Sequence, residues 1–303
     1  MNLPYCLNIH PGEDLASVRD AITRYACAVK ARVSPDAPYP LGLRLAAHAA
    51  EELTHPAALD AFRALLAQHD CFVTGINGFP YGAFHNTAVK TAVYRPDWST
   101  PERLTYTGRL ATFLAAVLPE GQTGNVSTVP LGYKGSGVGV QGSEGQRSEV
   151  GDREVGVLFP RQIAVMAEFL HDLKMRTGRE VVLAIEPEPD CLLEDTNEVI
   201  AWFEDELLYE GRKWLSANQR RTPDEAEALL RTYVGLCLDT CHFAVEFEDP
   251  LTAMIRFESA GLRIARIQLS AALRTTIGAE ALSRLGAFVD PVYLHQTKIR
   301  LPR

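Results

Sequence analysis

The chain has 303 residues, of which 47% are hydrophobic, and this supply is ample for a large buried core. Its formal net charge of −8 argues against a general nucleic-acid binder or a protein that adheres to anionic membranes. No apolar run approaches the roughly 18 residues of a membrane span, and the N-terminus shows no secretory signal pattern.

Six cysteines in a chain of this length do not form a disulfide framework. Four of them lie in or beside apolar runs, where free buried thiols are common. These four are Cys6, Cys71, Cys191 and Cys237. We therefore expect a reducing compartment and a cytoplasmic protein.

Short apolar runs alternate with helical patterns along the chain. The runs cover residues 3–9, 41–46, 71–78, 125–132, 180–188, 233–242 and 262–272. The helical patterns cover residues 14–33, 48–69, 100–118, 159–178, 196–211, 222–233 and 249–261. Several runs are almost continuously hydrophobic, as parallel strands covered on both faces are. The repeats predict one α/β domain over residues 1–303, as a βα barrel or a doubly wound sheet.

The absence of a G-x-G-x-x-G motif after the first run disfavours a dinucleotide-binding sheet, so a (β/α)8 TIM barrel is our prediction. An eighth strand is expected at residues 291–296, but no helical pattern follows it before Arg303. Either the last helix is missing, or the barrel closes with a segment that this chain lacks.

Two segments have irregular composition. Residues 76–99 form a long loop that serves either as a substrate lid or as packing over the barrel mouth. Its notable side chains are Tyr81, His85, Tyr94 and Trp98. Residues 134–155 are rich in Gly and Ser and predict a flexible loop insertion. No G-K-[ST] follows these glycines, which disfavours phosphate binding.

Polar residues follow most of the predicted strands, at the end where a barrel holds its active site. They are Asn8, His10, Asn77, Ser127, Thr128, Lys134, Glu186, Glu188, Asp239, His242, Gln268, Ser270 and His295.

Two strand-end carboxylates predict a metal site. Glu186 and Asp239 leave apolar strands, and a buried carboxylate needs a partner because an isolated buried charge is costly. Neighbouring strands lie about 4.8 Å apart, so both can reach one divalent cation. Oxygen ligands from these residues and Gln268, together with His242, suit Mg²⁺ or Mn²⁺ better than a structural Zn²⁺.

Simpler interpretations stay open at this stage. Asp239 can cap the following turn or pair with an arginine. Cys241 can be a thiolate ligand or a plain buried thiol, and His10 can be limited to a hydrogen bond within the first turn.

The stretch "GLCLDTCHFA" (235–244) resembles the Asp-Thr-x-His strand end of the xylose-isomerase-like barrel superfamily, which includes sugar isomerases, ketose 3-epimerases and endonuclease IV. "AIEPEP" (184–189) resembles the strand-five glutamate of that group. Further stretches such as "YCLNIHPGE", "STVPLGYK" and "DPVYLHQ" are similar to the metabolite-traffic protein EboE family over most of the chain. Members are described as isomerase/epimerase-like barrels, encoded with a prenyltransferase and implicated in moving a metabolite precursor.

The resemblance implies roles for four residues. Glu186 and Asp239 match metal ligands, and His242 matches a histidine that binds metal or substrate. Gln268 stands where a strand-seven histidine is usual, and the strand-eight glutamate of the epimerases has no counterpart. The zinc histidines of strands three and four in the endonuclease are also absent, so DNA repair is disfavoured.

Two functions follow as hypotheses. The first is an isomerase or epimerase dependent on Mg, Mn or Zn, with Glu186 as proton acceptor and His242 or His10 orienting the substrate. The expected substrate contacts are Asn77, Tyr81, His85, Lys134, Glu188, Ser270 and His295. The second is a non-catalytic metabolite-binding or trafficking protein with a degenerate metal site. The expected partners are a small metabolite and proteins of the same pathway, without nucleic acid.

Overall fold

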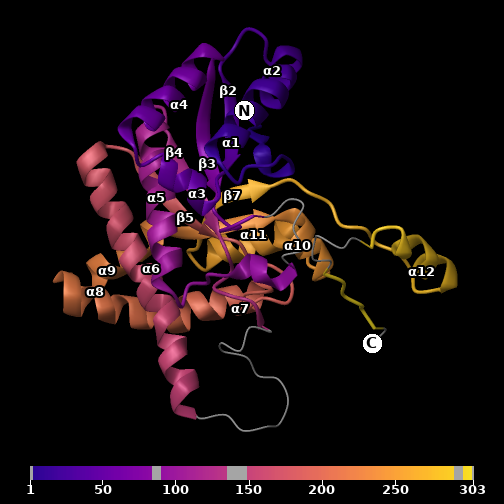
Figure 1. The fold of residues 1–303 in the computed structure, drawn as a ribbon. Coiled ribbons are helices and arrows are strands. Elements are labelled where there is room, and N and C mark those ends of the chain that lie inside the picture. Colours follow the sequence, from indigo (N-terminus) through magenta and orange to yellow (C-terminus); the bar gives the residue numbers. More distant parts are fainter. Residues whose placement is uncertain (1–2, 84–89, 135–148, 290–295, 302–303) are drawn as a thin grey trace.

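Seven parallel strands form one sheet in a computed structural model of the chain (Figure 1). The structure describes all residues except 1–2, 84–89, 135–148, 290–295 and 302–303, and the side chains of residues 149–155. The strands are β1 (Tyr5–Cys6), β2 (Tyr39–Arg44), β3 (Cys71–Asn77), β4 (Thr123–Thr128), β5 (Glu180–Ile185), β6 (Val234–Asp239) and β7 (Arg263–Gln268). The seven apolar runs from 3–9 to 262–272 therefore each overlap a strand, although β1 is short because Leu7–Ile9 turns into a 3₁₀-helix.

Helices follow the strands, and those before α12 cover the outside of the curled sheet (Figure 1). They are α1 (Leu15–Ala21), α2 (Cys27–Val33), α3 (Ala47–Glu52), α4 (Pro56–Gln68), α5 (Pro101–Val117), α6 (Glu149–Thr177), α7 (Thr196–Ala201), α8 (Arg212–Gln219), α9 (Pro223–Tyr233), α10 (Thr240–Val245), α11 (Pro250–Ser259) and α12 (Ala279–Gly286). The π-helical segments Ile22–Ala26 and Trp202–Gly211 join α1 to α2 and α7 to α8. Among the described helices, none is long and apolar enough to cross a membrane.

The strand order identifies the fold. Neighbours in the sheet are consecutive in sequence from β1 to β7, whereas a doubly wound sheet reverses its order at a switch point. The fold is therefore an α/β TIM barrel, as predicted, with seven strands in the described part of the chain. Most of the expected eighth strand, residues 291–296, lies outside the described residues. Helix α12 extends away from the sheet (Figure 1).

Local sequence signals explain several helix boundaries. Thr222 caps α9 in a reciprocal capping box with Glu225. Thr100 precedes Pro101 at the start of α5 but makes no side-chain cap bond. Helix α6 begins at Glu149, inside the range 134–155 that we expected to be a loop. The helix therefore starts ten residues before the helical pattern 159–178 from which it was predicted.

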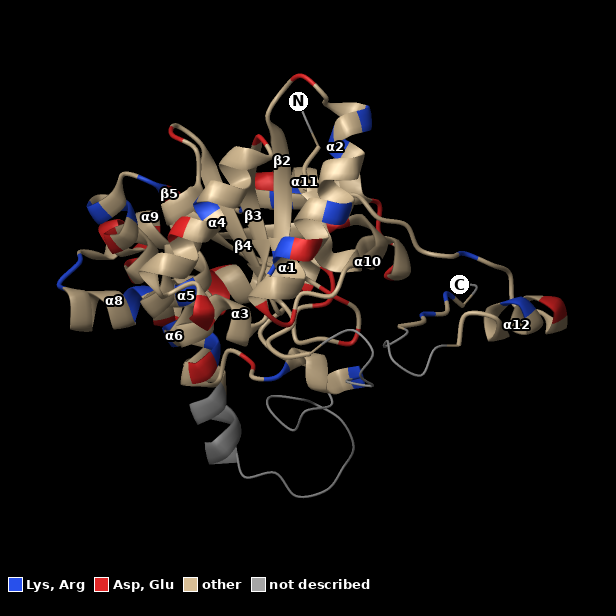
Figure 2. Ribbon diagram, turned by 45° about the horizontal axis from the view of Figure 1, so that its top comes forward, with Lys and Arg blue, Asp and Glu red and all other residues tan. Residues whose placement is uncertain are grey.

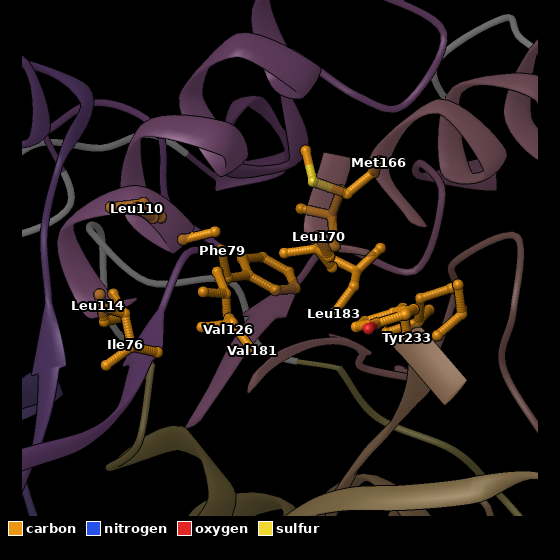
Figure 3. Packing of buried hydrophobic residues seen from close by; sticks show 14 of the residues in the cluster. Ile76, Phe79, Leu110, Leu114, Val126, Met166, Leu170, Val181, Leu183 and Tyr233 are labelled. Carbon is orange, nitrogen blue, oxygen red and sulfur yellow. The ribbon is translucent and has the colours of Figure 1, made fainter. Parts of the chain in front are cut away.

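The outward face of the sheet carries the main core. Alternate residues Val181, Leu183 and Ile185 of β5 are buried in the cluster between the sheet and the helices. Figure 3 shows Leu183 and Val181 in this layer with Leu170 of α6 and Tyr233 of α9. Close packing of branched side chains against helices therefore fixes the position of each strand.

The opposite face, here called the inward face, is small and polar. Register and alternation place Gly42, Gly75, Asn125, Ser127, Val182, Ala184, Cys237 and Arg266 on it. Val182, Ala184 and Cys237 are fully buried but lie outside the main cluster. Bulky branched residues usually fill the interior of such barrels, so this composition is unusual. Figure 2 shows charged residues spread over the helices, while β3 and β4 carry none.

Candidate functional site

Three neighbouring strands bring their polar end residues together. Glu186 follows β5, Asp239 ends β6, and Gln268 ends β7 beside Asp239 in register. The Gln268 Nε2 donates to Glu186 Oε1 at 2.7 Å and to Asp239 Oδ2 at 3.0 Å. Two carboxylates from different strands therefore converge on one nitrogen atom at the mouth of the barrel.

Glu186 is the most deeply buried of these carboxyl groups. Its backbone amide donates to Thr128 O at 3.1 Å, which fixes the chain as it leaves β5. Its Oε2 is buried and has no hydrogen-bond partner among the described residues. Burial raises the pKa of Glu186 to about 7, and the nearby Asp239 charge adds to this, while His242 and Arg266 oppose it.

Asp239 makes both local and long-range contacts. Its Oδ1 accepts from Cys241 N at 3.0 Å at the start of α10, and also from the Ser270 hydroxyl. Its Oδ2 remains directed at Gln268. Asp239 therefore caps the following helix, one of the simpler interpretations, and also joins the carboxylate pair.

His242 lies on α10, close to the carboxyl groups. Its Nδ1 lies 3.0 Å from Pro187 O, and its Nε2 lies 4.0 Å from Glu188 Oε1. Burial lowers the pKa of His242, but the surrounding carboxylates Glu188, Glu186 and Asp239 outweigh it, so the pKa is raised. A proton on Nδ1, bonded to the Pro187 carbonyl, would leave the Nε2 lone pair available as a ligand.

Glu188 is held by two residues from distant parts of the chain. Tyr94 OH donates to Glu188 Oε1 at 2.9 Å, and Gln296 Nε2 donates to the same oxygen at 3.0 Å. Burial raises the pKa of Glu188. Tyr94 and Trp98 are buried, so these parts of the predicted aromatic loop pack at the mouth.

An acidic rim beyond Glu188 holds two lysines. Lys134, a predicted substrate contact, pairs with Glu194 and lies 3.2 Å from Glu198. Lys298 also pairs with Glu194, and its Nζ lies 2.9 Å from Asp190 Oδ1. The C-terminal segment is therefore fixed to the loop that follows β5.

The remaining predicted contacts lie in local structure. Asn77 Oδ1 accepts from Phe79 N at 3.0 Å, and Tyr81 packs edge-to-face on Tyr106 with ring centroids 5.1 Å apart. His10 lies 2.8 Å from Tyr5 OH and stacks on Tyr25 at 4.2 Å. His85 and His295 lie outside the described residues. Roles for these residues in binding stay predictions.

The donor set fits a divalent cation in two overlapping ways. Asp239, Cys241 and His242 place ligand atoms within 4.8 Å of one another. Glu186 is not in this compact group, although its carboxylate faces Asp239 across the Gln268 amide. The unpartnered Glu186 Oε2 favours the predicted oxygen-rich set, in which a 180° rotation of the amide would present Gln268 Oε1 to the ion. Burial raises the pKa of Cys241 to about 12, which disfavours a thiolate in the metal-free protein.

Sequence reasoning missed Arg266 and the hydrogen bond from Gln296. Arg266 stands in the apolar run 262–272, where a charge on a strand was itself a signal. Gln296 ends the predicted eighth strand, but its contact with Glu188 joins residues 108 positions apart.

Several solved structures are similar to this chain at low sequence identity. A scan of protein-family models and a search of curated proteins found no match. Similar solved structures include apo 3-keto-D-glucoside 4-epimerase YcjR from E. coli, with 13% identity, 82% of this chain and 88% of that chain covered, and a TM-score of 0.39. The zinc-bound IOLI protein has 14% identity, 86% and 70% coverage, and a TM-score of 0.42. A magnesium-bound xylose isomerase-like TIM barrel protein from Mycobacterium smegmatis has 13% identity, 83% and 72% coverage, and a TM-score of 0.46.

Proposed function

We propose that this chain is a sugar isomerase- or epimerase-like barrel protein that acts on or binds a small hydroxylated metabolite through a divalent metal. The observation that carries the proposal is the convergence of Glu186 and Asp239 on one Gln268 nitrogen. Like charges this close repel each other, so such a pair is best explained by a cation that binds between them.

Four residues would hold the metal. Glu186 and Asp239 would supply carboxylate oxygens, Gln268 its amide oxygen, and His242 its Nε2. A divalent ion bound there would polarise neighbouring substrate oxygens as a Lewis acid. Cys241 would enter the ligand set only with a softer ion such as Zn²⁺.

Glu186 would accept the proton from a carbon beside the substrate carbonyl. Burial raises its pKa to about 7 in the metal-free protein, and a bound cation would lower that pKa and keep the carboxylate ionised as a proton acceptor. His242, fixed by Pro187 O, would orient a substrate oxygen, and burial at the strand end would exclude water from the transfer.

The motifs of the EboE family support a finer proposal. A role in metabolite traffic, with partner proteins of the same pathway, would follow from "YCLNIHPGE" and "DPVYLHQ", which stand at opposite ends of the chain. The same barrel mouth would then recognise the metabolite that is passed on.

A second candidate is a metabolite-binding protein without catalysis. Gln268 favours it, because its amide already hydrogen-bonds both carboxylates and holds them together without an ion. In that case the site would keep the shape of a metal centre and lose its chemistry.

Metal binding tests the first proposal. Purified protein would be stripped with EDTA, reloaded with Mn²⁺, dialysed and analysed for bound metal. We expect about one ion per chain in the wild type and a marked loss in Glu186→Gln and Asp239→Asn. Glu120→Gln, a change at an exposed carboxylate far from the mouth, is the matched control. A wild-type protein that retains no metal contradicts the proposal.

Proton exchange separates the two candidates. The Mn²⁺-loaded protein would be incubated with D-fructose and D-xylulose in D₂O and followed by NMR. Deuterium beside the carbonyl, lost in Glu186→Gln, indicates catalysis. Binding of these sugars without exchange would support the non-catalytic alternative.

A further inference from the structure

Arg266 places a cation inside the curled sheet. It stands two residues before Gln268 on β7, so both side chains leave the same face. A Cβ added to Gly42 on β2 would lie 3.7 Å from Arg266 Nη2. Strands β2 and β7 are not neighbours in the sheet, so the guanidinium crosses the interior towards the opposite wall.

Arg266 has no fixed acceptor in the described chain. Its Nη1 is buried without a hydrogen-bond partner, and no described carboxylate forms an ion pair with it. The Arg266 charge lowers the pKa of Glu186, so the two groups are near each other, but they form no ion pair. A buried guanidinium nitrogen that lacks an acceptor is unfavourable, so an acceptor from outside the chain would satisfy it.

Unpartnered oxygen atoms lie on the same inward face. Asn125 Oδ1, Ser127 Oγ and Glu186 Oε2 are buried and lack hydrogen-bond partners within the described residues. Gly75 leaves the space for Asn125, because a Cβ there would lie 2.7 Å from Asn125 Oδ1. One unsatisfied cationic donor therefore faces several unsatisfied acceptors.

We propose that the inward face binds the carboxylate of a small hydroxy acid, with Arg266 as the residue that selects for the acid. The carboxylate would accept from Arg266, while hydroxyl groups along the ligand would donate to Ser127, Asn125 and Glu186. This inference rests on the proposed function and names the substrate class of its site.

The spacing supports an acid of a few carbons. Residues two apart on a strand are separated by about 6.6 Å, so Arg266 lies one layer below the Glu186 and Gln268 level. A carboxylate at Arg266 would therefore leave the next few hydroxylated carbons level with Glu186, the proton acceptor of the proposed reaction.

A carboxylate fits this position better than a phosphate. A planar carboxylate matches the Arg266 guanidinium with two parallel hydrogen bonds. A phosphate carries more charge and needs more donors, whereas the neighbouring groups are acceptors. The two anions are separated by experiment.

Binding of matched acid and polyol probes tests the inference. Gluconate, sorbitol and inorganic phosphate would be titrated calorimetrically into the Mn²⁺-loaded protein. We expect gluconate to bind about ten- to a hundredfold more tightly than sorbitol, because a hydrogen bond to a charged group is worth that much. Arg266→Met should remove the difference, and Arg266→Lys should restore part of it. Arg284→Met, on exposed α12, is the control.

Thermal melting gives a second readout. Without ligand, Arg266→Met should melt at or above the wild-type temperature, because it removes a buried guanidinium nitrogen that lacks a hydrogen-bond partner. A lower melting temperature of Arg266→Met, together with equal losses of affinity for gluconate and sorbitol, would show that Arg266 has a structural role only. That result would overturn the inference. Equal wild-type affinity for the two probes, or preference for phosphate, would also overturn it.

Metal analysis keeps the two proposals distinct. If Arg266→Met binds Mn²⁺ like the wild type but loses gluconate selectivity, both proposals stand. If the wild type retains no metal after reloading but still selects gluconate, the metal proposal fails while the role of Arg266 remains.

Discussion

The two faces of the sheet differ in composition and in how well their buried groups are satisfied. The outward face packs branched side chains such as Leu183 and Val126 against helices, and these side chains carry no polar atoms that need hydrogen-bond partners. The inward face carries small and polar residues, and several of its buried atoms lack partners in the described structure. Packing on one side therefore supplies the stability that allows unsatisfied polar groups on the other.

A truncation on the outward face should have the largest effect. Leu183→Ala removes a side chain that is 1% exposed, and filling of the space by neighbours is limited in a close-packed layer. We expect a loss of about 2–5 kcal/mol in the free energy of unfolding, measured by urea denaturation. Leu251→Ala, at an exposed position of α11, should change it by less than about 0.5 kcal/mol. Equal effects of the two changes would contradict the comparison.

The fold was predictable because the apolar strand residues that pack against the helices appear in the sequence as recognisable apolar runs. Continuous apolar runs gave all seven strands, and the capping residues Thr222 and Glu225 marked the start of α9. The π-helical segment Trp202–Gly211 was not predictable, because its residues show an ordinary helical pattern and the altered bonding arises from packing.

The candidate site was predictable only in part. Glu186 and Asp239 each end an apolar strand, which signals a buried carboxylate needing a partner. That Gln268 joins them depends on the register of β6 and β7, which one sequence does not reveal. That the Arg266 side chain crosses the interior depends on the space beside Gly42 on β2, and these two residues are 224 positions apart in the sequence.

The pH dependence of stability should sharpen the view of the inward face. The folded pKa of Glu186, about 7, lies above its ordinary value of 4.5, so the native state holds its proton more tightly. This contribution is complete below pH 4.5 and is lost as the pH rises through about 7. Metal-free protein should therefore lose stability over that range, with a slope of at most about 1.4 kcal/mol per pH unit from this group.

Glu186→Gln tests this prediction, because it removes the titrating group and keeps a hydrogen-bond acceptor for Gln268. Urea denaturation of EDTA-treated protein at several pH values should show a flatter profile in the variant. Some slope should remain, because burial and contact with Glu194 raise the pKa of Glu246 to about 7 as well. An unchanged profile would mean that Glu186 is ionised in the folded state at low pH.

The smallest effect is expected at Ser127. Its hydroxyl is buried without a partner in the described part of the fold, so Ser127→Ala removes a polar group that gains nothing from folding. The free energy of unfolding should change by less than about 1 kcal/mol, or rise. A clear loss of stability would show that the hydroxyl has a partner, such as a bound water.

Gln268 also has a consequence for how such a site can change during evolution. Every glutamine codon becomes a histidine codon through a substitution at its third base. The position that now carries a bridging amide is therefore one base change from an imidazole, which would be a further nitrogen ligand for the proposed metal. Because the Gln268 amide already holds Glu186 and Asp239 together, such a change would begin from a site in which the two carboxylates are in place.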